Sequence, residues 1–257
     1  MEKKVRPLIL VTNDDSYQAK GIQSLVKAMS AIGKVVVVAP DKPQSGMGHA
    51  VTIHDPIRIQ RIEMPFADVA YSCSGTPVDC VKIALYTVLE RTPDIVVSGI
   101  NHGSNASINV IYSGTMSAAV EAAVEGIPSI GFSLLDYSAD ADFEASTKVA
   151  TTLVQTVLAD AHFPENTCLN VNIPKGKEIA GIKICRQANG MWKEQFEKRT
   201  DPFQKDYYWM TGEFVIKDKG EDTDQHALDN NYASVVPVQF DLTAHHAIAH
   251  LQKWDIE

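Results

Sequence analysis

The sequence of 257 residues predicts an α/β fold, a Rossmann-like three-layer sandwich around a mostly parallel sheet. Continuous apolar runs at residues 8–11 and 35–39, and a mostly apolar segment at 95–100, are typical of strands that are covered on both faces. Segments with helical spacing of apolar residues separate the first two runs and precede the third. The order strand, helix, strand at the beginning of the chain implies a right-handed βαβ unit.

The first half of the chain supports this fold element by element. Apolar residues at 22, 25, 26, 29 and 32 recur at helical intervals, and Gly33 ends that helix. A loop is expected at 41–49, and partial alternation over 51–62 indicates a strand or a hairpin arm. Thr76-Pro77-Val78-Asp79 predicts a helix start, because Thr is a good N-cap, Pro suits the first helical position and Asp suits the third.

The second half continues the alternation of helices and strands. We expect an alanine-rich helix from residue 113 to about 126 and a second helix at 147–158. Strands are expected at 130–132, 169–173 and 182–184.

The pattern changes from about residue 190. Residues 207–210 and 214–216 predict two short β segments joined through Gly212, a hairpin or arm outside the parallel core, and 243–254 predicts a terminal helix. Because short hairpins are marginal alone, we expect the arm to pack on another subunit in a homodimer or homotetramer. The chain is therefore expected to form a single domain over 1–257. Its α/β core and active site lie at 1–189, and its β arm and C-terminal oligomerisation segment lie at 190–257.

Composition limits the partners and the compartment. A formal net charge of −9 disfavours a broad binding surface for duplex nucleic acid but allows a small phosphorylated substrate held by a metal. We expect neither a signal peptide nor a membrane span, because the apolar runs are short. The four cysteines have no zinc or redox spacing, which favours buried thiols in a reducing cytoplasm.

Oxygen-bearing side chains follow three of the predicted parallel strands. Asp14 and Asp15 follow the first strand, and these adjacent carboxylates repel each other unless a proton or a cation lies between them. Asp41, Gln44 and Ser45 follow the second strand, and Asn101 follows the third, on the same rim of the sheet. Two carboxylates, a hydroxyl and an amide oxygen suit Mg²⁺, Mn²⁺ or Ca²⁺ rather than zinc. The alternative is a strand-to-helix turn capped by Asn and Asp.

Ser113-Gly114-Thr115 lies at a predicted helix start. Unpaired backbone N–H groups and the helix dipole favour a phosphate at such a position, and Gly114 allows a close approach of the backbone. The alternative is that Ser113 or Thr115 is only an N-cap. A metal site beside a phosphate site indicates metal-assisted phosphoester hydrolysis.

Several motifs now identify a resemblance. ILVTNDD, VVAPDKPQSGMGHAVT, GTPVDCV and PDIVVSGINHGSN with YSGTMSAAVEG occur in this order, with weaker similarity at Asp222-Thr223-Asp224, Ser234-Val235-Val236-Pro237 and Asp241-Leu242-Thr243. The chain resembles the SurE survival proteins, which are metal-dependent 5′/3′-nucleotidases. The resemblance therefore implies hydrolysis of nucleoside monophosphates, extending to short polyphosphate.

The resemblance also implies which residues form the site. It places one divalent ion per subunit (Mg²⁺ or Mn²⁺, with Ca²⁺ as an alternative) on Asp14, Asp15, Ser45 and Asn101, and makes Asp14 and Asp15 the catalytic residues. Phosphate contacts fall on Asn105, Ser113, Gly114 and Thr115. The family forms dimers, often paired into tetramers, with an exchanged carboxyl-terminal segment.

Two positions depart from the family pattern. Ser16 stands where the family usually has Gly, so the turn after the acids is altered if it needs backbone angles that only Gly adopts freely. Lys20 stands where the family usually has Pro, and its ammonium group either assists phosphate binding or is simply solvated.

Two interpretations are open for each of several histidine and aromatic side chains. His49 and His102 are either proton donors to a leaving alkoxide or structural histidines. His245, His246 and His250 fit a solvated or interface face better than a metal pair. Trp192, Phe196 and Phe203, interleaved with Lys193, Lys198 and Arg199, are either a lid over a base or an oligomer contact, and we expect a mobile loop that borders the site.

Two rival functions belong to other classes. A phosphoacceptor receiver domain also carries paired acids, but it needs a further Asp at the end of a central strand. Here that strand ends in Ser98-Gly99-Ile100-Asn101. A non-catalytic nucleotide-binding protein is the second rival, and phosphate release distinguishes it from an enzyme.

Overall fold

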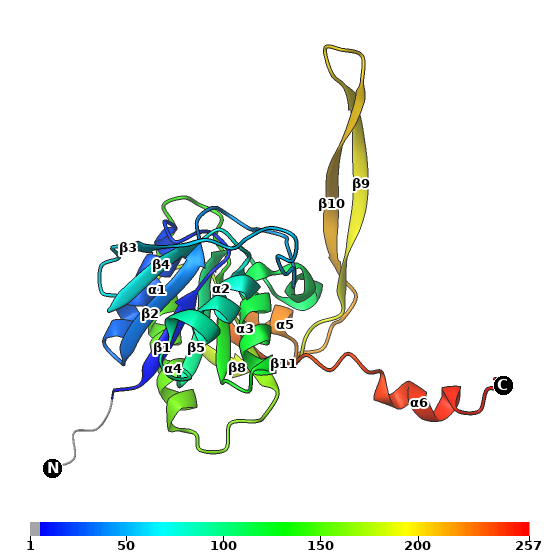
Figure 1. Cartoon of the computed structure of the whole chain (residues 1–257). Coiled ribbons are helices and arrows are strands. Elements are labelled where there is room, and N and C mark those ends of the chain that lie inside the picture. The colour runs from blue at the N-terminus through cyan, green and yellow to red at the C-terminus, as the bar shows by residue number, and fades with distance from the viewer. Residues whose placement is uncertain (1–5, 257) are drawn as a thin grey trace.

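A nine-stranded sheet forms the centre of the computed structural model, which describes residues 6–256 (Figure 1). Its order is β3-β4-β2-β1-β5-β6-β7-β11-β8. The strands are β1 (Leu8–Thr12), β2 (Lys34–Pro40), β3 (Ile59–Ile62), β4 (Val69–Cys73), β5 (Ile95–His102), β6 (Ser129–Leu134), β7 (Thr167–Ile173), β8 (Gly181–Ile184) and β11 (Tyr232–Gln239). Neighbouring strands from β4 to β7 are parallel, as are β11 and β8, whereas β3–β4 and β7–β11 are antiparallel. The mostly parallel sheet predicted from the sequence is confirmed.

Helices cover both faces of this sheet and complete the three layers. The helices within residues 6–256 are α1 (Lys20–Ser30), α2 (Pro77–Ile83), α3 (Gly114–Val124), α4 (Glu144–Ala159), α5 (Asp224–Asp229) and α6 (His245–Leu251), with a π-helical turn at Ala84–Val88 and a 3₁₀ turn at Ser107–Tyr112. Of these helices, α6 lies apart from the sheet (Figure 1). Apolar side chains of α1 and α4, such as Leu25 and Val154, pack with one face. Those of α2 and α3, such as Val81 and Ala118, pack with the other. The expected capping box is present at α2, where Thr76 and Asp79 bond reciprocally.

The sheet departs from the sequence prediction at three strands. A strand or hairpin arm was expected over 51–62, and only 59–62 of that segment is a strand. Its partner β4 was not predicted, because it is short and only partly apolar. β11 contains Pro237, which argues against a central strand. The proline is tolerated because β8 pairs with β11 only as far as Val235, so position 237 lies beyond the β8 pairing.

The structure of the last third of the chain differs from the prediction. β11 and α5 belong to the core, so the assignment of all residues after 190 to an arm and oligomerisation segment is wrong in that part. Residues 207–216 form one strand, β10 (Asp206–Ile216), and not two short segments. It pairs along its length with β9 (Gly190–Thr200). Gly212 does not break β10, since it pairs with Glu194 within the continuous ladder. A Cβ atom at position 212 would lie 2.7 Å from the Lys193 carbonyl oxygen across the pair, so the close approach of β9 favours glycine there.

The paired strands β9 and β10 form an arm that extends away from the core (Figure 1). Most of its residues are exposed, among them Phe196, Tyr208, Trp209 and Met210. The terminal helix α6, which the sequence predicts, has no buried residue. Within residues 6–256, no helix combines the length and apolar character that crossing a bilayer requires.

Candidate functional site

A pocket of about 220 Å³ lies where β1, β2 and β5 end. It gathers the predicted residues Asp14, Ser45, Asn101, Asn105 and Ser113. It also includes His102, Asn109, Tyr112, Tyr137 and Trp192. The carboxyl ends of neighbouring parallel strands thus bring together residues that are far apart in the sequence.

Asp14 is the most strongly constrained side chain of this pocket. Only 4% of it is exposed, and its Oδ1 accepts a hydrogen bond of 2.5 Å from the Thr115 hydroxyl. Burial, followed by the negative charge of Asp15, raises the pKa of Asp14 to about 6. Asp14 does not cap α1, whose N-cap is Ala19 without any side-chain hydrogen bond. A bound cation would relieve the cost of this buried carboxylate.

The N-terminus of α3 holds Asp14 in place. A Cβ atom on Gly114 would lie 2.7 Å from the Asp14 Cβ, so glycine is required by the approach of this side chain. The Thr115 hydroxyl and backbone N–H both favour the ionised form of Asp14. Gly114 and Thr115 were expected to contact a phosphate, whereas in the structure both contact Asp14.

Asp15 lies beside the pocket. Its Oδ2 accepts a hydrogen bond of 3.2 Å from the backbone N–H of His102, the last residue of β5. Burial also raises the pKa of Asp15. Two adjacent carboxylates with raised pKa values form a site that favours a cation.

The remaining oxygen donors fit a hard divalent ion. Asn101 donates from Nδ2 to the Gly103 carbonyl at 3.0 Å, which leaves its Oδ1 as the donor atom for a cation. The loop that carries Ser45 is tied to the site because Gln44 N–H donates to the Asp14 carbonyl at 2.7 Å. Residues 6–256 contain no cluster of three or more His, Cys, Asp and Glu side chains placed to hold a metal. The donor set predicted from the sequence, two carboxylates, one hydroxyl and one amide, has the oxygen chemistry that suits a hard cation such as Mg²⁺ or Mn²⁺.

Ser113 is the N-cap of α3, which was the alternative to a phosphate contact. Its Oγ accepts from the Met116 N–H at 3.0 Å, so its hydroxyl proton is still available to a ligand. The Asn105 side chain donates to Ser133 Oγ at 2.8 Å and has a second amide proton. Ser113 and Asn105 line the pocket and remain candidates for phosphate contact.

A buried asparagine network, which was not predicted from the sequence, supports the site loop. Asn172 Oδ1 accepts from the Asn105 backbone N–H, and the Asn170 side chain donates to the Asn105 carbonyl, each at 2.8 Å. The signal was present, because two asparagines interrupt an otherwise apolar strand at 169–173. Buried amides of this kind need partners, which here belong to the site loop.

Asp224 fixes the same loop from the other side. It is completely buried, and its carboxylate accepts from the backbone N–H groups of Ser107 at 2.7 Å and Ala188 at 2.9 Å. Ser107 begins the 3₁₀ turn that leads to Ser113, and Ala188 precedes the arm. Asp224 therefore connects the pocket loop with the base of the arm.

The two departures from the family pattern have different consequences. Ser16 has a φ of +83°, a left-handed conformation that favours glycine. Its Oγ accepts from the Gln18 N–H at 3.2 Å, which offsets part of that strain. Lys20 is exposed and lines a separate hollow beside Asp140, so it does not reach the Asp14 pocket.

The histidines that the sequence singles out have different surroundings. His49 Nε2 lies 2.8 Å from Glu121 Oε2 on α3, and Lys82 pairs with the same carboxylate. These partners lower the pKa of Glu121. His102 lines the pocket and packs edge-on against Phe143. His245 pairs with Asp241 in the exposed tail.

Trp192 borders the pocket from the base of β9. Phe196 lies further along the same strand and Phe203 lies in the turn between β9 and β10, and neither lines the pocket. The expected mobile loop is therefore wrong, because Trp192 and Phe196 belong to a paired strand.

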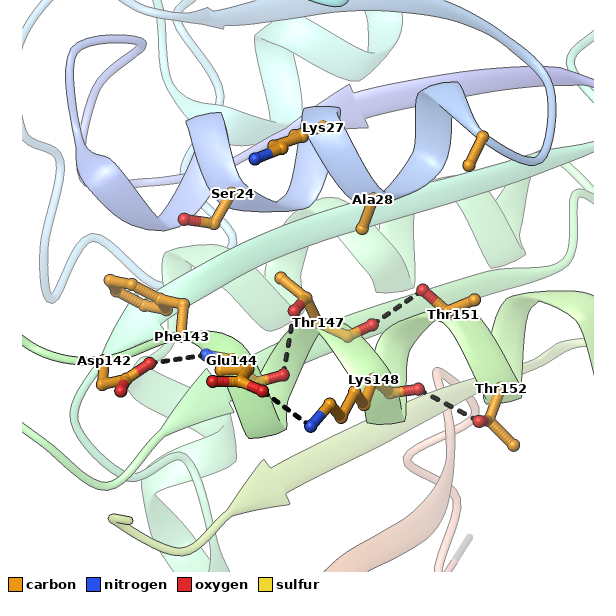
Figure 2. A pocket seen from close by; sticks show the side chains of 11 residues that line it. Ser24, Lys27, Ala28, Asp142, Phe143, Glu144, Thr147, Lys148, Thr151 and Thr152 are labelled. Carbon is orange, nitrogen blue, oxygen red and sulfur yellow. Dashed lines mark hydrogen bonds and ion pairs between the residues drawn. The ribbon is translucent and has the colours of Figure 1, made fainter. Parts of the chain in front are cut away.

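A larger hollow lies between α1 and α4 (Figure 2), with a volume of about 720 Å³. Its polar groups are bonded locally, for example Lys148 to Glu144 and the Thr151 hydroxyl to the Thr147 carbonyl. It contains none of the paired acids or strand-end residues of the Asp14 pocket. The smaller pocket is therefore the candidate active site.

Comparisons with known proteins agree with this assignment. A family model described as survival protein SurE matches residues 9–194. A protein of Christiangramia forsetii named 5′-nucleotidase SurE is 60% identical over 100% of this chain and 99% of its own length. A protein of Flavobacterium psychrophilum with the same name is 61% identical, covering 98% of each chain. The crystal structure of SurE protein from Aquifex aeolicus superposes with a TM-score of 0.83 at 40% identity, covering 96% of this chain and 98% of that one.

Proposed function

This chain belongs to the SurE family, and from that premise we propose that it is a nucleotidase. The proposed reaction is metal-dependent hydrolysis of the phosphate ester in nucleoside 5′- and 3′-monophosphates, with short polyphosphate as a further substrate. The observation that carries the proposal is Asp14, a buried carboxylate whose pKa is raised to about 6 within an oxygen-lined pocket. Relatives that are 60% and 61% identical carry the name 5′-nucleotidase.

We propose that Asp14, Asp15, Ser45 and Asn101 hold one Mg²⁺ or Mn²⁺ ion per chain. A bound ion supplies Lewis-acid polarisation of the phosphoryl group and lowers the pKa of the attacking water. Thr115 and Gly114 fix the Asp14 carboxylate, and the His102 backbone N–H fixes that of Asp15. Their orientation is set before substrate binds, so no rearrangement of the acids is required.

The phosphate is proposed to lie against Ser113, Asn105 and the start of α3. The Ser113 hydroxyl proton and the Asn105 amide are donors that line the pocket. Such donors also stabilise the charge that develops on the phosphoryl oxygens during displacement. Ser113→Ala is expected to lower kcat/KM on the order of tenfold to a thousandfold while metal binding persists.

The proposal is tested with a panel of phosphate esters and divalent metals. Released phosphate is measured for nucleoside 5′- and 3′-monophosphates and short polyphosphate with Mg²⁺, Mn²⁺, Ca²⁺ or a chelator. We expect metal-dependent release from the monophosphates and none from Asp15→Asn. Nucleotide binding without phosphate release would instead support a non-catalytic binding protein. A hydroxylamine-labile acyl phosphate would support a phosphoacceptor.

We further propose that the arm and α6 assemble this chain into a homodimer or homotetramer, with the C-terminal segment exchanged between copies. The supporting observation is their exposed apolar surface, which includes Trp209 and Met210 on the arm and Leu251 on α6. Light scattering that shows only a particle of 28.1 kDa would contradict this assembly. The buried and unpaired cysteines support a reducing, cytoplasmic location.

A further inference from the structure

Aromatic side chains gather at the mouth of the Asp14 pocket. Tyr112, Tyr137 and Trp192 all line it and are 51%, 80% and 39% exposed. They come from three separate places: the 3₁₀ turn before α3, the loop after β6, and the base of β9. We call these three residues the aromatic mouth.

The volume of the pocket limits how much of a nucleotide it can enclose. At about 220 Å³, the pocket is smaller than the roughly 300 to 1000 Å³ of sites that enclose a drug-sized ligand. The phosphate must lie near Asp14 and Ser113 for the proposed hydrolysis. The far end of a nucleoside monophosphate bound in this way would extend to the mouth, where the aromatic side chains lie.

Trp192 is held in a defined orientation. Its indole Nε1 donates to Asn109 Oδ1 at 2.8 Å, and its ring packs on Phe214 with centroids 5.2 Å apart and an interplanar angle of 56°. Asn109 belongs to the same 3₁₀ turn as Tyr112. A ring that is already fixed loses little conformational freedom when a ligand packs on it.

Tyr137 is supported by the backbone of the site loop. A Cβ atom on Gly103 would overlap the Tyr137 ring, so the ring packs directly on this glycine. Gly103 has a φ of +107°, a conformation that also favours glycine. The loop that carries Asn101 and Asn105 thus positions the second ring as well.

We propose that the aromatic mouth binds the nucleobase of the substrate by stacking, with Trp192 as the principal contact. This inference rests on the proposed nucleotidase function and adds the base subsite to it. Every base has a π face, so stacking accepts all bases without hydrogen-bond readout. The mouth therefore selects nucleotides over phosphate esters that lack a base, and it favours the larger purines over pyrimidines.

The test compares substrates with and without a base. Trp192→Ala, Trp192→Phe and wild type are assayed with adenosine 5′-monophosphate and with ribose 5-phosphate. For Trp192→Ala we expect KM for the nucleotide to rise on the order of tenfold, while kcat for the nucleotide and kcat/KM for ribose 5-phosphate stay unchanged. Trp192→Phe keeps a stacking ring and is expected to retain most of the nucleotide affinity.

A matched control separates stacking from general surface effects. Tyr86→Ala removes an aromatic side chain that is 72% exposed and lies outside both the pocket and the arm. We expect its kinetics to equal those of wild type with both substrates. Light scattering on each variant confirms that the assembly is the same.

A binding measurement makes the outcome independent of turnover. Saturation-transfer NMR is recorded for adenosine with the chelator-treated protein, and the signal should fall in Trp192→Ala but persist in Tyr86→Ala. Equal losses for adenosine 5′-monophosphate and ribose 5-phosphate, or an unchanged adenosine signal in Trp192→Ala, would overturn the base subsite. If wild type hydrolyses none of the esters, the proposed function fails, and the adenosine signal then decides the subsite by itself.

Discussion

Asp14→Asn should stabilise the metal-free protein while it removes activity. The pKa of Asp14 rises from 3.8 to about 6, because the carboxylate is buried and faces the charge of Asp15. A shift of about two units corresponds to about 3 kcal/mol lost from the free energy of unfolding when the group is ionised. Asparagine has nearly the same shape and can still accept from Thr115, so about 1 to 3 kcal/mol should be recovered.

The sign of the pH dependence follows from this raised pKa. Below pH 3.8, Asp14 is protonated in both the folded and the unfolded protein, so it contributes no penalty. As the pH rises through about 6 the penalty becomes complete, and metal-free wild type loses stability relative to Asp14→Asn. The difference between the two proteins should therefore be small near pH 4 and largest near pH 8.

Thermal unfolding in the presence of a chelator measures the effect. At pH 8 the Tm of Asp14→Asn should exceed that of wild type by about 3 to 10 °C, and added Mn²⁺ should raise only the wild-type Tm. Asp94→Asn is the matched control, because Arg91 and the Leu8 N–H lower the pKa of Asp94, and this substitution should destabilise the protein. A lower Tm for Asp14→Asn at pH 8, or a difference that does not vary with pH, would show that the Asp14 carboxylate does not destabilise the metal-free protein.

Three further substitutions test how the site is held. Gly114→Ala places a Cβ atom 2.7 Å from the Asp14 Cβ, so turnover should fall more than about a hundredfold with unchanged circular dichroism, and wild-type turnover would contradict this. Ser16→Gly relieves the strain of a φ of +83° and should raise the free energy of unfolding, measured in urea, by about 0.5 to 1 kcal/mol. A lower free energy of unfolding would show that the Ser16 hydrogen bond outweighs this strain. Asp224→Asn should cost about 2 kcal/mol and raise KM, whereas Asp229→Asn on the same helix should do neither.

The fold could be predicted from the sequence wherever local chemistry decides it. Apolar segments identified β1, β2 and β5, and the Thr76 to Asp79 pattern identified the start of α2, because each of these signals lies within a few residues. β11 could not be predicted, since Pro237 is acceptable only because β8 stops short of it. Gly212 was predicted to separate two short segments, because the contact that favours glycine there is with the neighbouring strand β9 and cannot be seen in the local sequence.

In the site, too, features set by the local sequence could be predicted, and those set by contacts between distant residues could not. The sequence indicated that Asp14, Ser45 and Asn101 share one rim, because parallel strands end together. It could not show that Gly114 and Thr115 contact Asp14, because that depends on how closely α3 approaches β1. Asp224 was equally hidden, since its partners Ser107 and Ala188 are distant in the sequence.

Phosphate release measured as a function of free metal tests whether Asp14 holds a metal ion that turnover requires. Wild type and Asp14→Asn are compared with a nucleoside 5′-monophosphate at pH 8, while Mg²⁺ or Mn²⁺ is titrated from chelated to saturating. We expect wild-type turnover to rise from zero and saturate with one ion per chain, and Asp14→Asn to show no turnover at any metal concentration. Near-native turnover by folded Asp14→Asn at saturating metal, or full wild-type turnover in the chelator, would contradict the account.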